Sequence, residues 1–340
     1  MTAVKDTPLQ QGEICLSIQD LSVELAEDGS SILDNVSIDL HAGEVFALVG
    51  ESGSGKSVTS MAAMRLLPDA LKITSGKVDI AGQDLFSLPE SRMLEIRGRR
   101  VAMIFQNAMT ALNPVQTVGD QVAETLRLHT QLRGQALRLR VEGAFAEVGI
   151  PSPAQRYDFY PHQLSGGQQQ RVMIAMALAC EPEVLIADEP TTALDVTIQQ
   201  QVLELIRELT QSRKLAVLLI THDMGVVNNV ADRVGVMYRG KIIEKAEVDA
   251  FFHNPQHEYS KRLIDALPDL RHFREANSTV PLLDISDMAI HFPIRKGLLQ
   301  RAVDYTRAVD GVSLEIGRGE TYALVGAVSY THLTLPTIQL

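Results

Sequence analysis

The fold is decided by the stretch EVFALVGESGSGKS, residues 44–57. Its first half is strand-length and almost entirely apolar, which is typical of a strand buried on both faces. Its second half fits G-x-x-x-x-G-K-[ST], a loop whose glycines let backbone N–H groups wrap around phosphate oxygens. The residues of this loop are Gly50, Glu51, Ser52, Gly53, Ser54, Gly55, Lys56 and Ser57. An ordinary Gly/Ser turn is the alternative, but the strand before the loop and the helix pattern after it favour nucleotide binding.

Three further apolar runs have the length of strands: RVAMIFQ (100–106), EVLIAD (183–188) and LAVLLITH (215–222). Helix patterns alternate with them, as around 198–209, where apolar residues share one face. This alternation predicts an α/β fold, a P-loop NTPase with a doubly wound parallel-sheet core. Residues 107–180 have helical spacing and predict a helical subdomain inserted into that core. Residues 233–246 predict a hairpin.

Two acidic residues, Asp188 and Glu189, end one of these strands. A carboxylate at the C-terminal end of a buried strand beside a phosphate-binding loop is where Mg²⁺ coordination is needed. We therefore assign Asp188 and the Ser57 hydroxyl to the metal, and Glu189 to polarising the attacking water. Lys56 is placed to reach the β and γ phosphates. A solvated acidic pair at the start of a loop is the alternative, and it would be preferred if the phosphate-binding loop were absent.

A third chemical element is LSGGQ, residues 164–168. Ser165, followed three residues later by Gln168, forms a helix capping box ahead of an apolar-periodic helix. Two consecutive glycines, Gly166 and Gly167, weaken a helix start unless close backbone approach is required. The element is therefore predicted to be a second phosphate-facing helix N-terminus as well as a cap.

LSGGQ is the signature of ABC ATPases, and on this complete motif the chain resembles that family. The resemblance implies an antiparallel β subdomain and roles for three more residues. Gln106 would contact Mg²⁺ and the attacking water, and Asp195 in TTALDVT would communicate across an ATP-bound dimer. His222 in ITHDMG would contact the γ phosphate. Singly, these residues have ordinary alternatives as a capping Gln, a helix-capping Asp and a strand-end His. Leu25 departs from the family, which has an aromatic residue there to stack on adenine.

The chain also repeats part of itself. DNVSIDLHAGEVFALVG (34–50) matches DGVSLEIGRGETYALVG (310–326), and DLSVEL (20–25) matches DMAIHF (287–292). We expect a complete ABC nucleotide-binding domain at 13–268, a linker at 269–280, and the N-terminal fragment of a second ABC domain at 281–326. Residues 327–340 are expected to be a non-native tail, because VSYTHL is what translation of a transposon-end sequencing adapter gives. A natural short tail is the alternative.

Composition excludes several classes of protein. No apolar run approaches the ~18 residues needed to cross a bilayer. The net charge of −11 argues against a broad nucleic-acid surface, so no nucleic-acid partner is expected. The opening MTAVKDTPLQQGE has no signal-peptide pattern, which favours the cytoplasm. Any association with a membrane is therefore expected to come through a partner.

Longer phrases refine the resemblance. YPHQLSGGQQQRVMIAMAL and NPQHEYSKRLIDALP resemble the ATPases of dipeptide, oligopeptide and nickel importers, and FPIRKGLLQR resembles the tandem subgroup that includes glutathione importers. This implies ATP and Mg²⁺ as cofactors, and a site shared with a second ABC domain, in the same chain or in a homodimer. The chain alone is expected to hydrolyse ATP weakly.

The same resemblance implies a peripheral position on the cytoplasmic face of the inner membrane. The partners would be the transmembrane subunits of an ABC permease and, indirectly, an extracytoplasmic solute-binding protein. A non-transport ABC ATPase, acting on the ribosome or in DNA repair, is the alternative. The short junction at 269–280 and the short segment between Gln106 and LSGGQ argue against it. A P-loop kinase or GTPase would not need LSGGQ.

Overall fold

The computed structural model describes residues 12–106, 111–191, 196–267, 281–296 and 301–324. The chain divides into two units, Met1–Leu267 and Pro268–Leu340, and each is described by itself. Within the described residues, the first unit contains two sheets surrounded by helices, and the second contains one two-stranded sheet.

The central sheet of the first unit has the strand order β10-β9-β3-β8-β7-β6 in the described part of the chain. Its strands are β3 (Val45–Val49), β6 (Val101–Ile104), β7 (Val184–Asp188), β8 (Ala216–Ile220), β9 (Arg233–Tyr238) and β10 (Lys241–Glu247). Every neighbouring pair is parallel except β9 and β10, which form the predicted hairpin. Strands β3, β7 and β8 are buried at every residue. The prediction of a parallel-sheet core is therefore confirmed.

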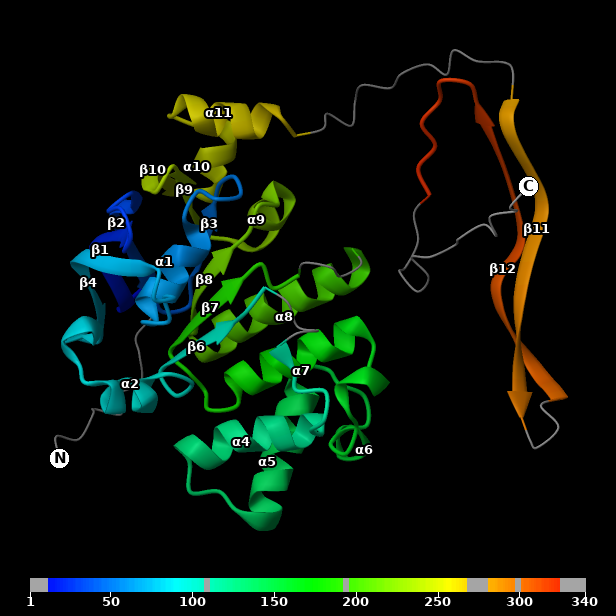
Figure 1. Ribbon diagram of the computed structural model, residues 1–340, viewed down its shortest axis with the longest axis horizontal. Coiled ribbons are helices and arrows are strands. Elements are labelled where there is room, and N and C mark those ends of the chain that lie inside the picture. Colours follow the sequence, from blue (N-terminus) through cyan, green and yellow to red (C-terminus); the bar gives the residue numbers. More distant parts are fainter. Residues whose placement is uncertain (1–11, 107–110, 192–195, 268–280, 297–300, 325–340) are drawn as a thin grey trace. The chain divides into compact units, whose positions relative to one another are not determined.

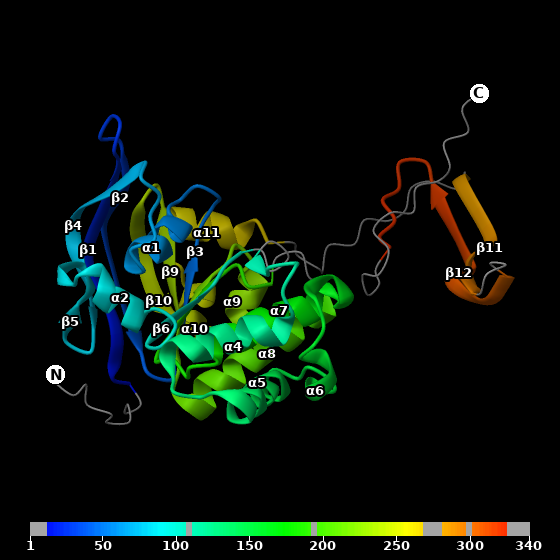
Figure 2. The same ribbon diagram turned by 60° about the horizontal axis from the view of Figure 1, so that its bottom comes forward.

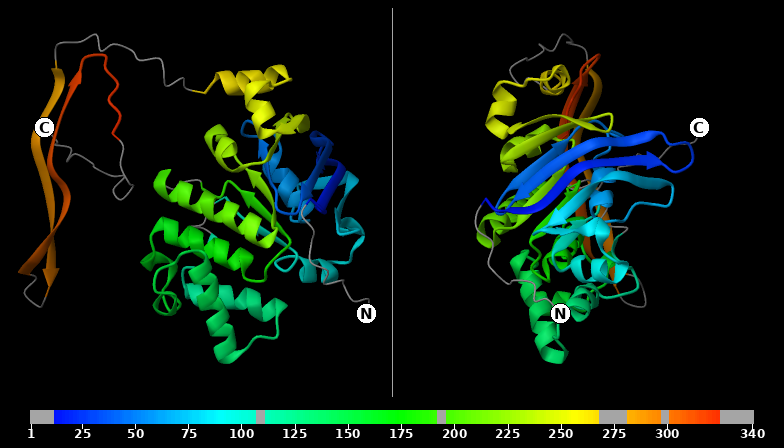
Figure 3. Two further views of the ribbon diagram at one scale, coloured as in Figure 1. Left: turned by 180° about the vertical axis from the view of Figure 1, so that it is seen from behind. Right: turned by 90° about the vertical axis from the view of Figure 1, so that its left-hand side faces the viewer.

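Helices pack against one face of this sheet (Figure 1). Within the described residues, the inserted helical subdomain contains α4 (Val118–His129), α5 (Gly134–Glu147), α6 (Pro153–Arg156) and α7 (Gly166–Leu178). The others on this side are α8 (Val196–Arg213), α9 (Met224–Val230), α10 (Val248–His253) and α11 (Glu258–Asp265). Figure 3 shows α10 and α11 at the end of the unit opposite the helical subdomain. The subdomain was predicted over 107–180, and its residues 107–110 lie outside the described part of the chain.

The other face of the central sheet is covered by an antiparallel sheet with the order β2-β1-β4-β5. Its strands are β1 (Ile14–Leu25), β2 (Ser31–His41), β4 (Leu71–Ile80) and β5 (Gln83–Asp84). Helix α1 (Lys56–Ala63) lies between the two sheets (Figure 2). The short elements η1 (Leu85–Ser87) and α2 (Glu90–Ile96) lead into β6, and η2 (Pro161–Gln163) precedes α7. This sheet is the predicted antiparallel β subdomain.

Along each central strand, successive side chains point alternately to the helical layer and to the antiparallel sheet. Val217 and Leu219 of β8 pack in the cluster of the helical subdomain and α8. Ala216, Leu218 and Ile220 pack in the cluster of α1 and the antiparallel sheet. Because successive side chains of a strand point to opposite faces, five consecutive apolar residues supply both layers. The continuous apolar runs of the sequence therefore follow from burial on both faces.

The second unit contains a hairpin of β11 (Pro281–Lys296) and β12 (Arg301–Gly317). Its register repeats that of β1 and β2 over the matching residues. Ile285 pairs with Leu314, as Ile18 pairs with Ile38 in the first unit, and the neighbouring ladder irregularities fall at matching places. One backbone detail repeats as well. The N–H of Asp287 donates to Ser313 Oγ at 2.9 Å, as the N–H of Asp20 donates to Ser37 Oγ at 2.9 Å.

The turn between β9 and β10 connects three parts of the first unit. Arg239 and Gly240 both have positive φ angles, 47° and 78°, which suits a tight hairpin turn. The N–H of Gly240 donates to Ser54 O at 2.9 Å, and its carbonyl accepts from the N–H of Asp34 at 2.9 Å. A Cβ at Gly240 would lie 2.3 Å from Ile32 O. Glycine is therefore required here by close backbone approach as well as by φ.

We predict that Gly240→Ala lowers the free energy of unfolding by about 2–4 kcal/mol, because the new methyl group must displace the β2 backbone. Gly82→Ala is the matched control. Gly82 has a similar φ of 82°, but a Cβ there meets nothing within 4 Å. That substitution should cost only about 1 kcal/mol. Urea unfolding of both variants measures the difference, and equal losses would contradict the importance of the close approach.

Candidate functional site

The phosphate-binding loop leaves β3 in a path that only glycine allows. Gly50 has a φ of 150°, and a Cβ on it would lie 2.2 Å from Met237 O of β9. Gly55 has a φ of 109°, and a Cβ on it would lie 2.6 Å from Leu33 Cδ2 of β2. The loop therefore runs directly against two strands before α1 begins at Lys56.

Lys56 is buried, and its ammonium group lies inside the loop. Its Nζ donates to Gly50 O at 2.8 Å and to Glu51 O at 2.9 Å. Burial lowers the pKa of Lys56, although the Glu189 and Asp188 carboxylates act in the opposite direction. The loop thus holds a cation at the place where the sequence predicted the β and γ phosphates of a nucleotide.

Asp188 ends β7 with a buried side chain. Its Oδ1 has no hydrogen-bond partner within the described residues. Burial raises the pKa of Asp188, and a hydrogen bond with the Ser57 side chain opposes that rise. A buried carboxylate oxygen without a partner, next to a hydroxyl, fits a bound Mg²⁺ ion.

The metal would need further oxygen ligands from another source. Among the described residues, no group of three or more His, Cys, Asp or Glu side chains could hold a metal ion. Mg²⁺ is usually bound by one or two carboxylates together with substrate phosphates, so this arrangement suits a nucleotide-bound ion.

Glu189 brings together two residues from distant parts of the sequence. Gln106 Nε2 donates to Glu189 Oε2 at 2.8 Å, and His222 Nδ1 lies 3.0 Å from Glu189 Oε1. Glu189 has a positive φ of 46°, which is uncommon for a residue other than glycine. Its N–H donates to Ile220 O at 2.9 Å, so the end of β8 holds this backbone conformation. All three predicted catalytic residues therefore lie within one hydrogen-bonded group.

The LSGGQ element forms the predicted helix cap at the start of α7. Gln168 N donates to Ser165 Oγ at 3.4 Å, and Ser165 N donates to Gln168 Oε1 at 3.3 Å. A Cβ at Gly167 would lie 2.7 Å from Ile198 Cγ2 of α8, whereas a Cβ at Gly166 would meet nothing within 4 Å. Packing of α7 against α8 thus accounts for one glycine, and Gly166 is open to approach from outside.

The structure does not bring all predicted site residues together. The side-chain hydrogen bonds of Ser165 and Gln168 to described residues join these two residues to each other. They therefore make no such bond to the phosphate-binding loop. Asp195 lies outside the described residues, so its predicted role remains a prediction.

Two contacts of the site were not predicted from the sequence. Gln170 Nε2 donates to Pro190 O, which connects α7 to the residue after Glu189. The N–H of Glu51 donates to Tyr259 Oη at 3.2 Å. No motif indicates either contact, because each depends on how distant segments pack.

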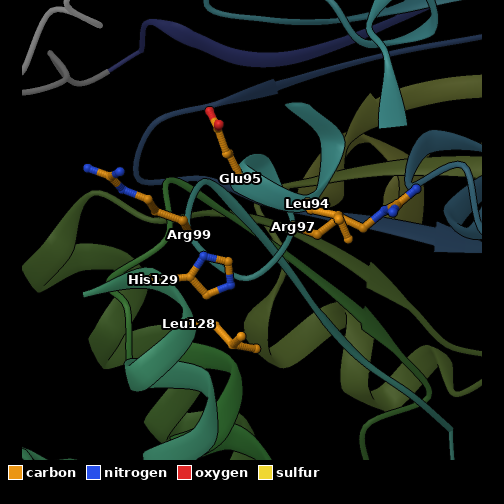
Figure 4. A pocket seen from close by; sticks show the side chains of 6 residues that line it. All are labelled: Leu94, Glu95, Arg97, Arg99, Leu128 and His129. Atoms are coloured by element: carbon orange, nitrogen blue, oxygen red, sulfur yellow. The ribbon is translucent and has the colours of Figure 1, made fainter. Parts of the chain in front are cut away.

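A separate hollow of about 400 Å³ lies between α2 and the end of α4 (Figure 4). The residues that line it are Leu94, Glu95, Arg97, Arg99, Leu128 and His129. Leu94 and Leu128 are 61% and 75% exposed. Burial lowers the pKa of His129, and the Arg99 charge lowers it further. The hollow therefore combines exposed apolar side chains with the charged side chains of Glu95, Arg97 and Arg99.

Comparison with known proteins gives consistent matches. Residues 33–192 match the protein family described as "ABC transporter". The dipeptide transport ATP-binding protein DppD of Bacillus subtilis is 51% identical over 261 residues, covering 76% of this chain and 78% of DppD. The peptidoglycan transport ATP-binding protein YejF of Agrobacterium fabrum is 46% identical, covering 92% of this chain and 58% of YejF. The glutathione import ATP-binding protein GsiA of Escherichia coli O157:H7 is 43% identical, covering 92% and 55%. The chain spans little more than half the length of the last two.

Solved structures match the first unit's architecture. The ATP-binding cassette MJ0796, a dimer in a post-hydrolysis state bound to ADP and Pi, is similar with a TM-score of 0.61 and 27% identity. The match covers 68% of this chain and 98% of that one. The cbiO1 protein of Clostridium perfringens, part of the ABC transporter complex cbiONQ, has a TM-score of 0.62 at 27% identity, covering 71% and 92%. These similarities confirm the predicted fold class.

We predict that Asp188→Asn raises the free energy of unfolding of the nucleotide-free protein by about 1–2 kcal/mol. The neutral amide avoids the cost of a buried charge whose Oδ1 has no partner within the described residues. Asp69→Asn, at an exposed position, removes the same charge and should have little effect. Thermal and urea unfolding without nucleotide or metal measure both. A loss of stability in Asp188→Asn would show that this carboxylate supports the fold.

Proposed function

This chain belongs to the ABC transporter ATP-binding protein family, and on that premise we propose that it is the ATP-binding and ATP-hydrolysing subunit of an importer for peptides or related small solutes. The observation that carries the proposal is the convergence of Lys56, Asp188 and Glu189 at one end of the central sheet. Relatives named for dipeptide, peptidoglycan and glutathione transport support this class of solute.

In the proposed ATP site, the chain supplies charge and ligands in fixed places. Lys56 would turn from the loop carbonyls toward the β and γ phosphates, and the loop N–H groups would bind phosphate oxygens. Ser57, Asp188 and Gln106 are the residues that would hold Mg²⁺. When bound, that ion neutralises charge developing on the phosphates.

Hydrolysis would depend on the Glu189 group. Its carboxylate would accept a proton from the attacking water or orient it, as a general base does. Gln106 and His222 contact its two oxygens and so orient the carboxylate. In the proposed mechanism Gln106 would also contact the water, and His222 the γ phosphate. The positive φ of Glu189 is consistent with backbone strain held at a functional site.

We further propose that the complete site is shared between two ABC domains. Ser165, Gly166, Gly167 and Gln168 of one domain would contact the nucleotide held by the other, and Asp195 would act across that interface. The open position of Gly166 supports this arrangement. The partner would be a second domain beginning at 281, or a second copy of this chain. The register shared by β11–β12 and β1–β2 supports the first possibility.

The proposed importer also requires a membrane partner. In the described residues, no helix is sufficiently long and apolar to cross a bilayer. We place the contact with the permease transmembrane subunits in the hollow between α2 and α4, where exposed Leu94 and Leu128 flank cationic side chains. A short amphipathic permease helix with acidic residues would suit it. We propose that the chain lies on the cytoplasmic face of the inner membrane, with an extracytoplasmic solute-binding protein as an indirect partner.

The catalytic assignment is tested with Glu189→Gln. We expect ATP hydrolysis to fall at least about 100-fold while ATP affinity is retained, because the amide cannot take a proton. Phosphate release, measured over a range of protein concentrations that includes self-association, and calorimetric titration with MgATP give the two quantities. Glu208→Gln on the exposed face of α8 is the control. Hydrolysis at the wild-type rate in Glu189→Gln would remove this residue from the mechanism.

The permease contact is tested with the pair Leu94→Asp and Leu128→Asp. Acidic side chains should disrupt an apolar contact and repel the expected acidic helix, so co-purification with co-expressed permease subunits should fall at least about 10-fold. ATP affinity should stay unchanged, since neither residue contacts the phosphate-binding loop. Ile14→Asp, at a 48% exposed position on β1, is the control. Undiminished co-purification of the double variant would place the contact elsewhere.

A further inference from the structure

A residue of α11, Tyr259, hydrogen-bonds to the backbone of the phosphate-binding loop. The N–H of Glu51 donates to the Tyr259 hydroxyl at 3.2 Å, although the two residues are far apart in the sequence. Tyr259 is only 3% exposed. Its ring packs in the cluster that contains Ala47 and Val49 of β3, the strand that enters the loop.

The start of α11 is itself held firmly on the central sheet. The Glu244 carboxylate of β10 accepts from the N–H groups of Gln256 and His257 at 2.8 and 2.9 Å. The His257 ring then caps the helix, since its Nδ1 accepts from the N–H of Tyr259 at 3.1 Å. These bonds leave Tyr259 little freedom to move away from the loop.

The loop backbone is also hydrogen-bonded at Ser54, next to a residue that packs on Tyr259. The Tyr259 ring lies 4.4 Å from the Tyr238 ring, centroid to centroid. Tyr238 directly precedes the β9–β10 turn, where the Gly240 N–H donates to Ser54 O at 2.9 Å. The loop backbone is therefore held at Glu51 and at Ser54 by neighbouring, mutually packed residues that belong to no nucleotide-binding motif.

The hydroxyl of Tyr259 is suited to this role over a wide pH range. Burial raises the pKa of Tyr259; the hydrogen bond from the Glu51 N–H opposes this rise, and the Glu51 carboxylate adds to it. A neutral phenol accepts from the Glu51 N–H and keeps its own proton to donate. It fixes the loop without placing a competing charge beside the phosphates.

We propose that Tyr259 is a positioning residue for nucleotide binding: its hydroxyl holds the phosphate-binding loop in the conformation that receives phosphates. The inference rests on the ATP site proposed above. A loop that is already ordered loses less conformational freedom on binding, so its affinity is higher. Nucleotide affinity then depends on how α11 sits on the sheet, and anything that displaces α11 weakens ATP binding.

The test uses Tyr259→Phe in the full chain, with MgATP titrated calorimetrically well below the unfolding temperature. The ring and its packing remain, and only the hydroxyl is lost. We expect Kd to rise roughly 2- to 10-fold, the range that one hydrogen bond supplies. Tyr238→Phe removes a hydroxyl from the same ring pair and should leave Kd unchanged. A merely structural Tyr259 would lower the unfolding temperature and leave the Kd of the folded protein as it was, which would overturn the proposal.

Glu51→Pro provides a second, independent arm, because it removes the donated N–H and leaves Tyr259 in place. Proline requires a negative φ, and Glu51 is not among the residues with a positive φ. If the bond carries the effect, adding Tyr259→Phe to Glu51→Pro weakens ATP binding no further. Additive losses would show that Tyr259 acts by another route. Failure of the wild-type chain to bind MgATP would contradict the proposed function instead, so the two failures are distinguishable.

Discussion

The close approach of the phosphate-binding loop to β9 is the constraint on which the rest of the site depends. Strands β3 and β9 pair in parallel up to Val49 and Val236, so the loop leaves the sheet already in contact with its neighbour. A side chain at Gly50 would meet the Met237 carbonyl at 2.2 Å, and the sheet cannot widen to admit it. The direction of the loop, the start of α1 and the position of Lys56 follow from this single approach.

Much of the site could be predicted from the sequence, because parallel strands present their C-terminal ends at the same edge. The apolar runs predicted strands β3, β6, β7 and β8, and Asp188 and Glu189 were predicted to lie beside the phosphate-binding loop. Gln106 and His222 were assigned by the resemblance to ABC ATPases, and in the structure both contact Glu189 from positions just after β6 and β8. Their chemical roles remain predictions, but their proximity required only strand ends, a parallel sheet and the correct strand neighbours.

Other features could not be predicted, because they depend on contacts between segments that no local pattern connects. The contact between Glu51 and Tyr259 joins a loop to a helix, and in the described part of the chain seven strands and several helices separate the two residues in the sequence. The positive φ of Glu189 is set by the Ile220 carbonyl of the neighbouring strand. The motif around Gly167 predicted close approach of a phosphate. In the structure, packing against the Ile198 side chain already accounts for a glycine at this position. In each case tertiary packing fixes a choice that the sequence leaves open.

Both charged groups at the centre of the site carry a cost that binding would relieve. Burial lowers the pKa of Lys56 and raises that of Asp188, so each group is held where its charged form is disfavoured. A phosphate anion beside Lys56 and a divalent cation beside Asp188 would each stabilise the charged form. Because such ligands bind the folded chain and not the unfolded one, they also stabilise it. The two ligands reinforce each other, since the metal cation offsets the repulsion between the phosphate and the nearby Asp188 and Glu189 carboxylates. A site assembled in this way favours the nucleotide–metal complex over either component alone.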